Sequence, residues 1–189
     1  MTKIFPLLVM FGFILSSPLA RAEQDLPVVP HVDLERYLGT WYEIARIEHS
    51  FQKGCLNSTA EYSLRDDGDI RVVNSCDKAG QEERDVATAR AWVTDRESNA
   101  KLRVQFVLTG LKLNFLSGRY WIIALGEDYD YAMIGEPGRN YLWILSRTPM
   151  MDPDLRDRLV NRASELGFDV DRLVYNEQIV GSQTSEDIS

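Results

Sequence analysis

The stretch GTWYEIA, residues 39–45, decides how the rest of this chain is arranged. Its glycine leads into a strand whose first large side chain is Trp41, and a buried indole needs a hydrogen-bond partner for its N–H group. About a hundred residues later, WILSRTP (143–149) predicts a second strand that runs into Arg147. We interpret the strands between these stretches as one meandering sheet that returns Arg147 to Trp41 and closes one end of a barrel.

Eight candidate strands follow one another along the chain, separated by turn sequences at short intervals. Asp66-Asp67-Gly68-Asp69 and Pro137-Gly138-Arg139-Asn140 are the clearest of these turns. The predicted fold is all-β, an eight-stranded antiparallel up-and-down β-barrel with one C-terminal α-helix packed on the outside. The strands are expected near residues 40–47, 57–64, 69–76, 84–93, 101–108, 119–125, 130–135 and 140–146.

The one clear helical pattern follows the last of these strands. Asp152 predicts an N-cap, Pro153 suits the first helical position, and Gly167 predicts the end of the helix. A further short strand is expected at Leu173-Val174-Tyr175. The helix carries one apolar stripe, made of Leu155, Leu159, Val160, Ala163 and Leu166.

The first 22 residues resemble a signal peptide, which predicts an exported protein. Lys3 precedes an apolar run, and Ala20-Arg21-Ala22 fits the small-residue cleavage rule. The run is too short to span a bilayer, and a hydrophobic helix kept in the mature fold is the alternative. No cysteine lies near the cleavage site, so we expect a periplasmic or secreted protein without a lipid anchor. Residues 23–181 are then an N-terminal arm with the barrel domain, and 182–189 a disordered tail.

Charge and cysteine content narrow the function further. The net charge of −8 at pH 7 argues against nucleic acid and against anionic membrane surfaces as partners. Two cysteines in an exported chain, Cys55 and Cys76, suggest one disulfide, with two free thiols as the alternative. A hairpin turn centred on Asp67-Gly68 would place Cys76 opposite Thr59, so a bulge or bend has to bring Cys76 to Cys55.

Successive strands of a meander run in opposite directions, so alternate connections lie at the same end of the barrel. Trp41 and Arg147 fall at one end, and an arginine over an indole contributes about 0.5–2 kcal/mol. We therefore expect Arg147 to be structural and not a ligand contact, the alternative being an ordinary rim arginine beside an ordinary core tryptophan. The opposite, open end receives the segments 48–56, 77–83, 109–118 and 136–139.

These features resemble the signature regions of the lipocalins. The Gly39-x-Trp41 start, DYDY at 128–131 and Arg147 after the eighth strand have the family's order and spacing. Residues 34–64 (LERYLGTWYEIARIEHSFQKGCLNSTAEYSL) and 141–149 (YLWILSRTP) are similar to the bacterial outer-membrane lipocalin and apolipoprotein D group almost throughout. The sequence departs from the bacterial members at the cleavage site, where it has Ala22 and they usually have a cysteine, so membrane anchoring is not carried over.

The resemblance implies a barrel with a cavity open at one end for a small hydrophobic ligand, a fatty acid or a lysophospholipid in this subgroup. It implies transport or maintenance of membrane lipids in the cell envelope. It also implies that one group of residues closes the other end of the barrel: Gly39, Trp41, Asp130 and Arg147.

Alternation of side chains along the strands predicts which residues line the interior. Small inward residues, Ala60, Ala89, Ala91 and Ala124, favour a void over a filled core. The alternative is a filled barrel that acts as an interaction module. The residues predicted to bind the ligand are Ala60, Tyr62, Val72, Asn74, Ala91, Val93, Val104, Phe106, Tyr120, Ile122, Tyr141 and Trp143.

The sequence offers little for catalysis, so we expect a binding protein with no catalytic residue, cofactor or metal. His31 and His49 are its only histidines, and it has no nucleophile elbow, glycine-rich phosphate loop or zinc-protease motif. A thiol-dependent enzyme is the alternative if Cys55 or Cys76 were free. The apolar loop Leu111–Leu116 at the open end predicts either transient membrane contact or a loop folded over the barrel wall. A monomer or weak homodimer is expected.

Overall fold

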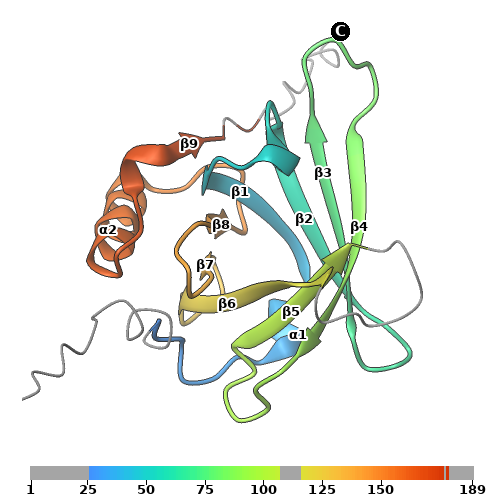
Figure 1. Cartoon of the computed structure of the whole chain (residues 1–189), viewed down its shortest axis with the longest axis vertical. Helices are drawn as coiled ribbons and strands as arrows, with labels where there is room; N and C mark the ends of the chain where they lie inside the picture. Colours follow the sequence, from blue (N-terminus) through green and yellow to red (C-terminus); the bar gives the residue numbers. More distant parts are fainter. Residues whose placement is uncertain (1–25, 107–115, 177, 179–189) are drawn as a thin grey trace, which may run out of the picture.

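The computed structural model describes residues 26–106, 116–176 and 178, which form a closed antiparallel barrel (Figure 1). The predicted fold class is confirmed. The predicted signal peptide, most of the 109–118 loop and the 182–189 tail lie outside these residues. The barrel strands are β1 (Gly39–Ile47), β2 (Leu56–Leu64), β3 (Ile70–Asp77), β4 (Asp85–Val93), β5 (Lys101–Phe106), β6 (Gly118–Leu125), β7 (Tyr131–Gly135) and β8 (Leu142–Ser146).

Strand β1 closes the barrel because it pairs with β2 on one side and with β8, the last barrel strand, on the other. Its first half pairs with β2, where Trp41 lies opposite Ala60, and it also pairs with β8, where Glu43 lies opposite Leu145. Along its second half, the short strand β9 (Leu173–Tyr175) takes the place of β2. The C-terminal half of β1 is therefore held by β9, and β2 diverges from β1 there, toward the open end of the barrel.

Helix α2 (Pro153–Glu165) packs on the outside of the barrel, next to β9 (Figure 1). The Asp152 carboxylate caps its first turn by accepting a hydrogen bond from the Leu155 N–H at 2.9 Å. Gly167 ends it with a φ of +86°, a conformation that glycine adopts without strain. Leu159 and Ala163 are buried in an apolar cluster between helix and sheet, the outer cluster, which also contains Ile44, Met133 and Ile144. Short 3-10 turns lie at Ser50–Gln52 and Val170–Arg172.

Two bulges change which side chains face inward. In β1 the pairing with β8 shifts between Glu43 and Ala45, so Glu43 faces the interior while Ala45 belongs to the outer cluster. In β6 the pairing with β7 shifts between Ile122 and Ala124. The expectation that Ala124 faces inward is therefore wrong: Ala124 packs in the outer cluster, and Leu125 takes the inward direction.

The Cys55–Cys76 disulfide joins the tops of β2 and β3, with Cα atoms 5.4 Å apart, as predicted. The register differs from the expected one by one residue, because Thr59 pairs with Ser75 and not with Cys76. A shift in the pairing between Leu56 and Thr59 brings the two cysteines together, and Asn57 within it has a φ of 49°. The expected bulge is confirmed, in the strand segment next to the disulfide.

The closed end of the barrel is organised around Trp41, which is fully buried. Its Nε1–H donates to the backbone oxygen of Tyr37 at 2.9 Å, and Tyr37 belongs to the single-turn helix α1 (Leu34–Tyr37) that lies across this end (Figure 1). The Arg147 guanidinium lies over the indole, with its Cζ 3.8 Å from the ring centroid. The two residues that strand parity assigns to one end are thus in contact.

Backbone groups hold Arg147 in this position. Its side chain donates to the carbonyl oxygens of Arg36, Thr40 and Tyr129 at 2.7, 2.9 and 3.2 Å, and its backbone N–H donates to the Asp130 oxygen at 2.8 Å. Gly39 has a φ of +94°, and a Cβ atom built there would lie 3.4 Å from Nη1 of Arg147. These contacts bring the predicted closure residues Gly39, Trp41, Asp130 and Arg147 together.

No helix within the described residues is long and apolar enough to cross a membrane.

Candidate ligand cavity

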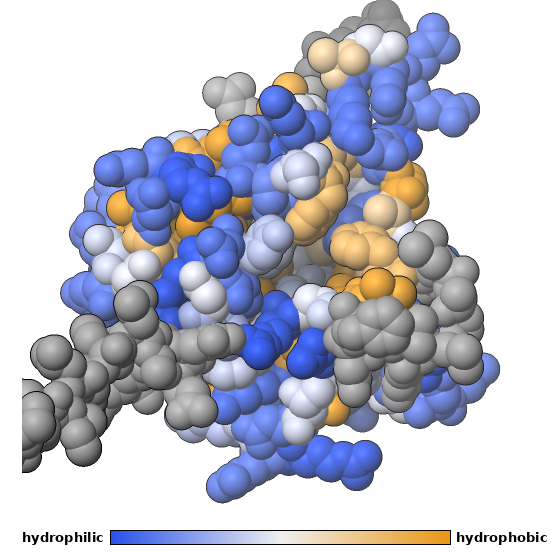
Figure 2. All heavy atoms as spheres, viewed as in Figure 1, coloured by the Kyte–Doolittle hydropathy of each residue, from blue (hydrophilic) through white to orange (hydrophobic). Residues whose placement is uncertain are grey.

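The barrel is hollow at the end opposite Trp41, with a cavity of about 760 Å³. This volume lies within the range typical of small-molecule sites, about 300–1,000 Å³. Figure 2 shows the opening as a hollow in this face of the molecule, with hydrophobic side chains gathered around it. The cavity contradicts the alternative of a filled barrel.

Most of the residues predicted to bind the ligand line this cavity. Ala91, Val93 and Ile122 do not, and they belong instead to the apolar cluster around Trp41 that fills the closed end. The cavity is therefore shorter than the barrel, which strand alternation alone cannot reveal. The predicted residues in the lining are Ala60, Tyr62, Val72, Asn74, Val104, Phe106, Tyr120, Tyr141 and Trp143.

Aromatic side chains surround the mouth. Phe51, Phe106 and Tyr141 are each more than a third exposed, and the Phe51 ring centroid lies 6.1 Å from that of Phe106 and 5.9 Å from that of Tyr141. Phe51 is on the loop between β1 and β2, which sequence reasoning assigned to the open end without naming a contact residue. Leu116, 57% exposed, is the described part of the predicted apolar loop; Leu111 to Phe115 lie outside the described residues.

The upper wall carries a buried polar network centred on Glu43. One carboxylate oxygen accepts from Nη1 of Arg46 at 2.6 Å, and the other accepts from the Gln52 amide at 2.9 Å. The Gln52 oxygen in turn accepts from Nε1 of Trp143 at 3.0 Å. Asn176, after β9, also donates to the Glu43 carboxylate, at 2.9 Å. The network fixes the Trp143 ring in the cavity wall and balances the buried charge of Glu43 with that of Arg46.

Sequence reasoning missed both polar members of this network that line the cavity, Glu43 and Gln52. A two-residue period counted from Trp41 would have directed Glu43 inward, so its position was recoverable from the pattern. Gln52 lies in a short 3-10 turn, where no strand alternation applies.

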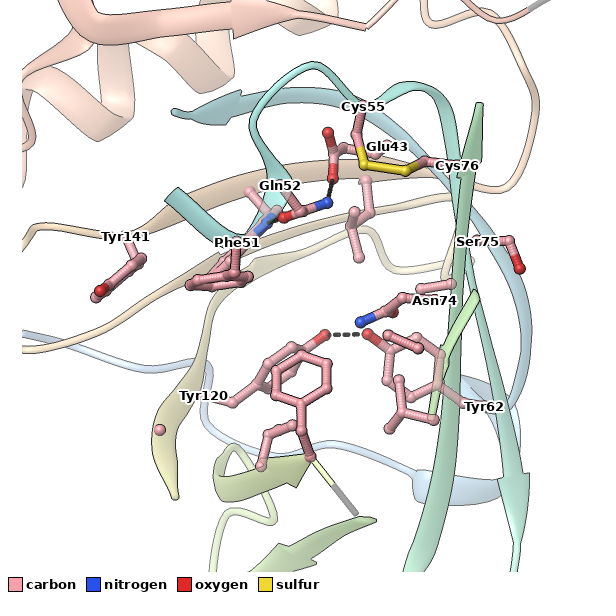
Figure 3. A pocket seen from close by; sticks show the side chains of 18 of the residues that line it. Glu43, Phe51, Gln52, Cys55, Tyr62, Asn74, Ser75, Cys76, Tyr120 and Tyr141 are labelled. Atoms are coloured by element: carbon pink, nitrogen blue, oxygen red, sulfur yellow. Dashed lines mark hydrogen bonds between the residues drawn. A yellow bond between two sulfur atoms is a disulfide. The ribbon is translucent and has the colours of Figure 1, made fainter. Parts of the chain in front are cut away.

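Two tyrosines form the floor. The Tyr62 and Tyr120 hydroxyls are 2.9 Å apart, as the dashed line in Figure 3 marks, and the Tyr120 hydroxyl also lies 2.8 Å from that of Tyr37. Burial raises the pKa of Tyr62 to about 12 and raises the pKa values of Tyr37 and Tyr120 well above the usual range. The floor is therefore polar but uncharged.

His49 packs behind the mouth. Its ring is stacked on Phe51 with centroids 3.7 Å apart and lies 5.3 Å from the Trp143 ring. Both ring nitrogens are buried without a hydrogen-bond partner in the described structure. Burial, followed by the nearby positive charge of Arg46, lowers the pKa of His49 to about 4. His49 is thus a neutral aromatic packing residue at physiological pH.

The disulfide leaves no free thiol at Cys55 or Cys76, and the alternative of a thiol-dependent enzyme required one. Cys55 and Cys76 are the only cysteines of the chain, and both are oxidised. They lie close to Asp85, but sulfur atoms in a disulfide are not the thiolates that bind metal ions. Among the described residues, Cys55, Cys76 and Asp85 are the one group whose side chains converge as metal ligands would.

The geometry defines a class of protein: an eight-stranded antiparallel barrel, closed at one end and hollow at the other, built to hold one small ligand. The chain belongs to the lipocalin family, since the family model of the lipocalin-like domain matches residues 32–178.

Relatives and solved structures agree with this assignment. The chain is 40% identical over 155 residues to the outer membrane lipoprotein Blc of Citrobacter freundii, covering 82% of this chain and 84% of that protein. It is 30% identical over 161 residues to mouse apolipoprotein D, covering 80% of each chain. Insecticyanin of the tobacco hornworm Manduca sexta has the same fold, with a TM-score of 0.64 at 19% identity over 80% of this chain and 84% of that one. The chain is therefore a lipocalin similar to Blc and apolipoprotein D.

Proposed function

We propose that this lipocalin binds one single-chain lipid, a fatty acid or a lysophospholipid, in its cavity and carries it within the cell envelope. The observation that carries the proposal is the 760 Å³ cavity with its mostly apolar lining and exposed aromatic mouth. A single acyl chain gains from burial along such walls, at about 25 cal/mol per Å² of apolar surface. Family membership supports the coarser statement that the ligand is small and hydrophobic.

The distribution of charge favours an orientation with the lipid head at the mouth. The floor is buried and its tyrosines are uncharged, so a carboxylate there would lose its hydration without meeting a positive charge on them. Glu43 in the upper wall is already paired with Arg46. Arg103 and Arg119 are the arginines among the described lining residues, and they lie opposite each other on β5 and β6, next to the open end. A carboxylate or phosphate is expected on that side, with the acyl chain below it.

An envelope location fits the relatives that are named outer membrane lipoproteins. We keep the proposal that the chain is exported through residues 1–22 and acts without a lipid anchor, as a monomer or weak homodimer. Mass measurement of the mature protein from its host tests this part, since cleavage after Ala22 without an added acyl group is expected. An acylated N-terminus would contradict it.

Titration with a fluorescent fatty acid tests the ligand assignment. Saturable binding with one site per chain is expected, with competition by lysophospholipid. Ala60→Phe places a large ring in the cavity wall and should weaken binding at least about tenfold. Glu61→Phe is the matched control, because Glu61 is the next residue along β2, is exposed and does not line the cavity. Equal affinities for the two variants would show that the fatty acid binds elsewhere.

A further inference from the structure

The three tyrosine hydroxyls below the cavity form a chain with Tyr120 in the middle. Its hydroxyl lies 2.8 Å from that of Tyr37 and 2.9 Å from that of Tyr62. In the described part of the molecule these two contacts are the only hydrogen bonds of the three hydroxyl groups. The side chains of Tyr37 and Tyr62 are buried in the barrel interior, and that of Tyr120 is partly buried beside them.

Counting protons shows that this chain is incomplete. Each hydroxyl brings one proton to donate, so three protons are present for two hydrogen bonds. Whichever way the hydroxyls rotate, one O–H is left without an acceptor among the described residues. A buried donor without an acceptor loses the hydration it would have in the unfolded chain. The spare O–H can therefore be satisfied only by an acceptor other than these three hydroxyls, such as a ligand oxygen that enters the cavity.

Only two of the three hydroxyls can meet such an acceptor. Tyr62 and Tyr120 line the cavity, whereas Tyr37 does not. When Tyr37 donates to Tyr120 and Tyr120 donates to Tyr62, the Tyr62 proton is free to point into the cavity. Asn74 also lines the cavity, and Figure 3 draws its amide among the lining side chains. A molecule that reaches the floor thus meets an O–H donor in a cavity that also offers the Asn74 amide.

The floor selects an acceptor that carries no charge. Burial, and for Tyr62 also the Glu43 carboxylate, raises the pKa values of these tyrosines, so a negative charge is disfavoured among them. Among the described residues, Arg147 is the arginine whose positive charge lowers the pKa values of Tyr37 and Tyr62 against the effect of burial. Arg147 lies over Trp41 at the closed end and donates to three backbone carbonyls, so it does not offer its donors to the cavity.

We propose that Tyr62 and Tyr120 form a subsite for an uncharged oxygen at the deep end of the ligand. The inference rests on the proposed function and narrows it. The preferred ligand is a long chain with a hydroxyl, keto or ester oxygen at the end that enters first, an oxygenated lipid in place of a plain saturated one. Without the subsite such an oxygen would lose its hydration at the floor and gain nothing in return.

Two pairs of probes isolate the contribution of the terminal oxygen: hexadecanoate with ω-hydroxyhexadecanoate, and dodecanoate with ω-hydroxydodecanoate. Within each pair the charged head and the chain are the same. Affinities are measured by competition against a bound fluorescent fatty acid, and the readout is the ratio of the two dissociation constants for each protein variant. A variant that is less stable, or whose cavity has changed shape, should bind both probes of a pair more weakly. This common effect cancels in the ratio of the two dissociation constants.

In the wild type, the ω-hydroxy member of at least one pair should bind as tightly as its plain partner or more tightly. The double variant Tyr62→Phe/Tyr120→Phe removes both hydroxyls that face the cavity and should shift the ratio about tenfold against the ω-hydroxy probe. Tyr37→Phe is the matched control. It also removes a hydroxyl oxygen from the row of three tyrosine hydroxyls. The two hydroxyls that remain share one hydrogen bond and keep one spare proton. The ratio of dissociation constants should therefore stay at the wild-type value.

The failures are distinguishable. Saturable binding of the plain acids together with rejection of both ω-hydroxy probes by the wild type would overturn the subsite and leave the proposed function standing. A double variant that keeps the wild-type ratio would overturn the subsite in the same way. Absence of saturable binding for every probe would overturn the proposed function, and the subsite with it.

Discussion

Arg147 shows how one side chain can close a barrel. It covers the indole of Trp41 and bonds three carbonyls that belong to α1, β1 and the turn before β7. These carbonyls lie in the last turn of a helix, near the start of a strand and in a turn, where backbone partners are fewest. The arginine therefore ties together chain segments that are far apart in sequence, at the end away from the ligand.

Arg147→Ala should lower the free energy of unfolding by about 1–3 kcal/mol, because it removes the stacked cation and leaves those carbonyls without a partner. For a domain of this size the melting temperature should fall by several degrees. Affinity for a fluorescent fatty acid, measured well below that temperature, should change less than about tenfold. Arg71→Ala, at an exposed arginine on β3, controls for the loss of one positive charge. Unchanged stability with lost binding would contradict the assigned orientation of the barrel.

His49 should make stability depend on pH between its ordinary pKa of about 6.5 and its folded pKa of about 4. In that window the unfolded chain binds a proton at His49 and the folded chain does not, so acidification favours unfolding. His49→Phe keeps a ring against Phe51 and Trp143 but cannot titrate. The melting temperature, measured at a series of pH values from 7 to 4, should therefore fall less for the variant than for the wild type. Parallel curves would mean that His49 is protonated in the folded state.

At the scale of elements, local chemistry predicted the strands and the helix well. Alternation and turn sequences located every barrel strand within about two residues of its observed start, because each strand has one face toward the interior and is bounded by residues that favour turns. The bulges were harder. The shift in β6 has no glycine or proline to mark it, so Ala124 was assigned to the wrong face. The shift in β2 was predicted only because the two cysteines required one.

The cavity was predictable only in part, for a related physical reason. Inward-facing residues follow from alternation, but the depth to which they pack together does not. Ala91 and Ile122 face inward as expected, yet they are packed against the Trp41 cluster below the cavity. Phe51 and Gln52 belong to a connecting segment whose course over the mouth depends on contacts with Arg46, Glu43 and Trp143. Such contacts are not encoded in a local pattern.

The N-cap of α2 offers a test at this scale. Asp152→Ala removes the acceptor for the Leu155 N–H and should cost about 0.5–2 kcal/mol in urea unfolding. Asp152→Asn keeps a side-chain oxygen in the same place and should cost much less. Lipid affinity should be unchanged in both variants, because α2 packs on the outside of the barrel. Equal losses for Ala and Asn would show that the negative charge matters and not the cap.

In the whole molecule, one end of the barrel is packed and stabilises the fold, and the other end contains the cavity. The end around Trp41 is densely packed and tied by Arg147, which allows the other end to stay hollow without collapse of the sheet. The C-terminal segment reinforces the upper wall, since the Gln178 amide donates to the carbonyls of Glu43 and Ser58 at 2.8 and 2.9 Å. A ligand that binds the hollow end should stabilise the fold by mass action, by about 2.7 kcal/mol at a hundredfold excess over the dissociation constant.

Native mass spectrometry of the protein purified from its own host tests the proposed lipid binding most directly. We predict one adduct per chain with the mass of a single-chain lipid, which organic extraction removes and added lysophospholipid restores. Ala60→Phe should reduce the adduct, and Glu61→Phe should not. A chain that carries no adduct from its host, and acquires none when fatty acids or lysophospholipids are added, would contradict the proposed function.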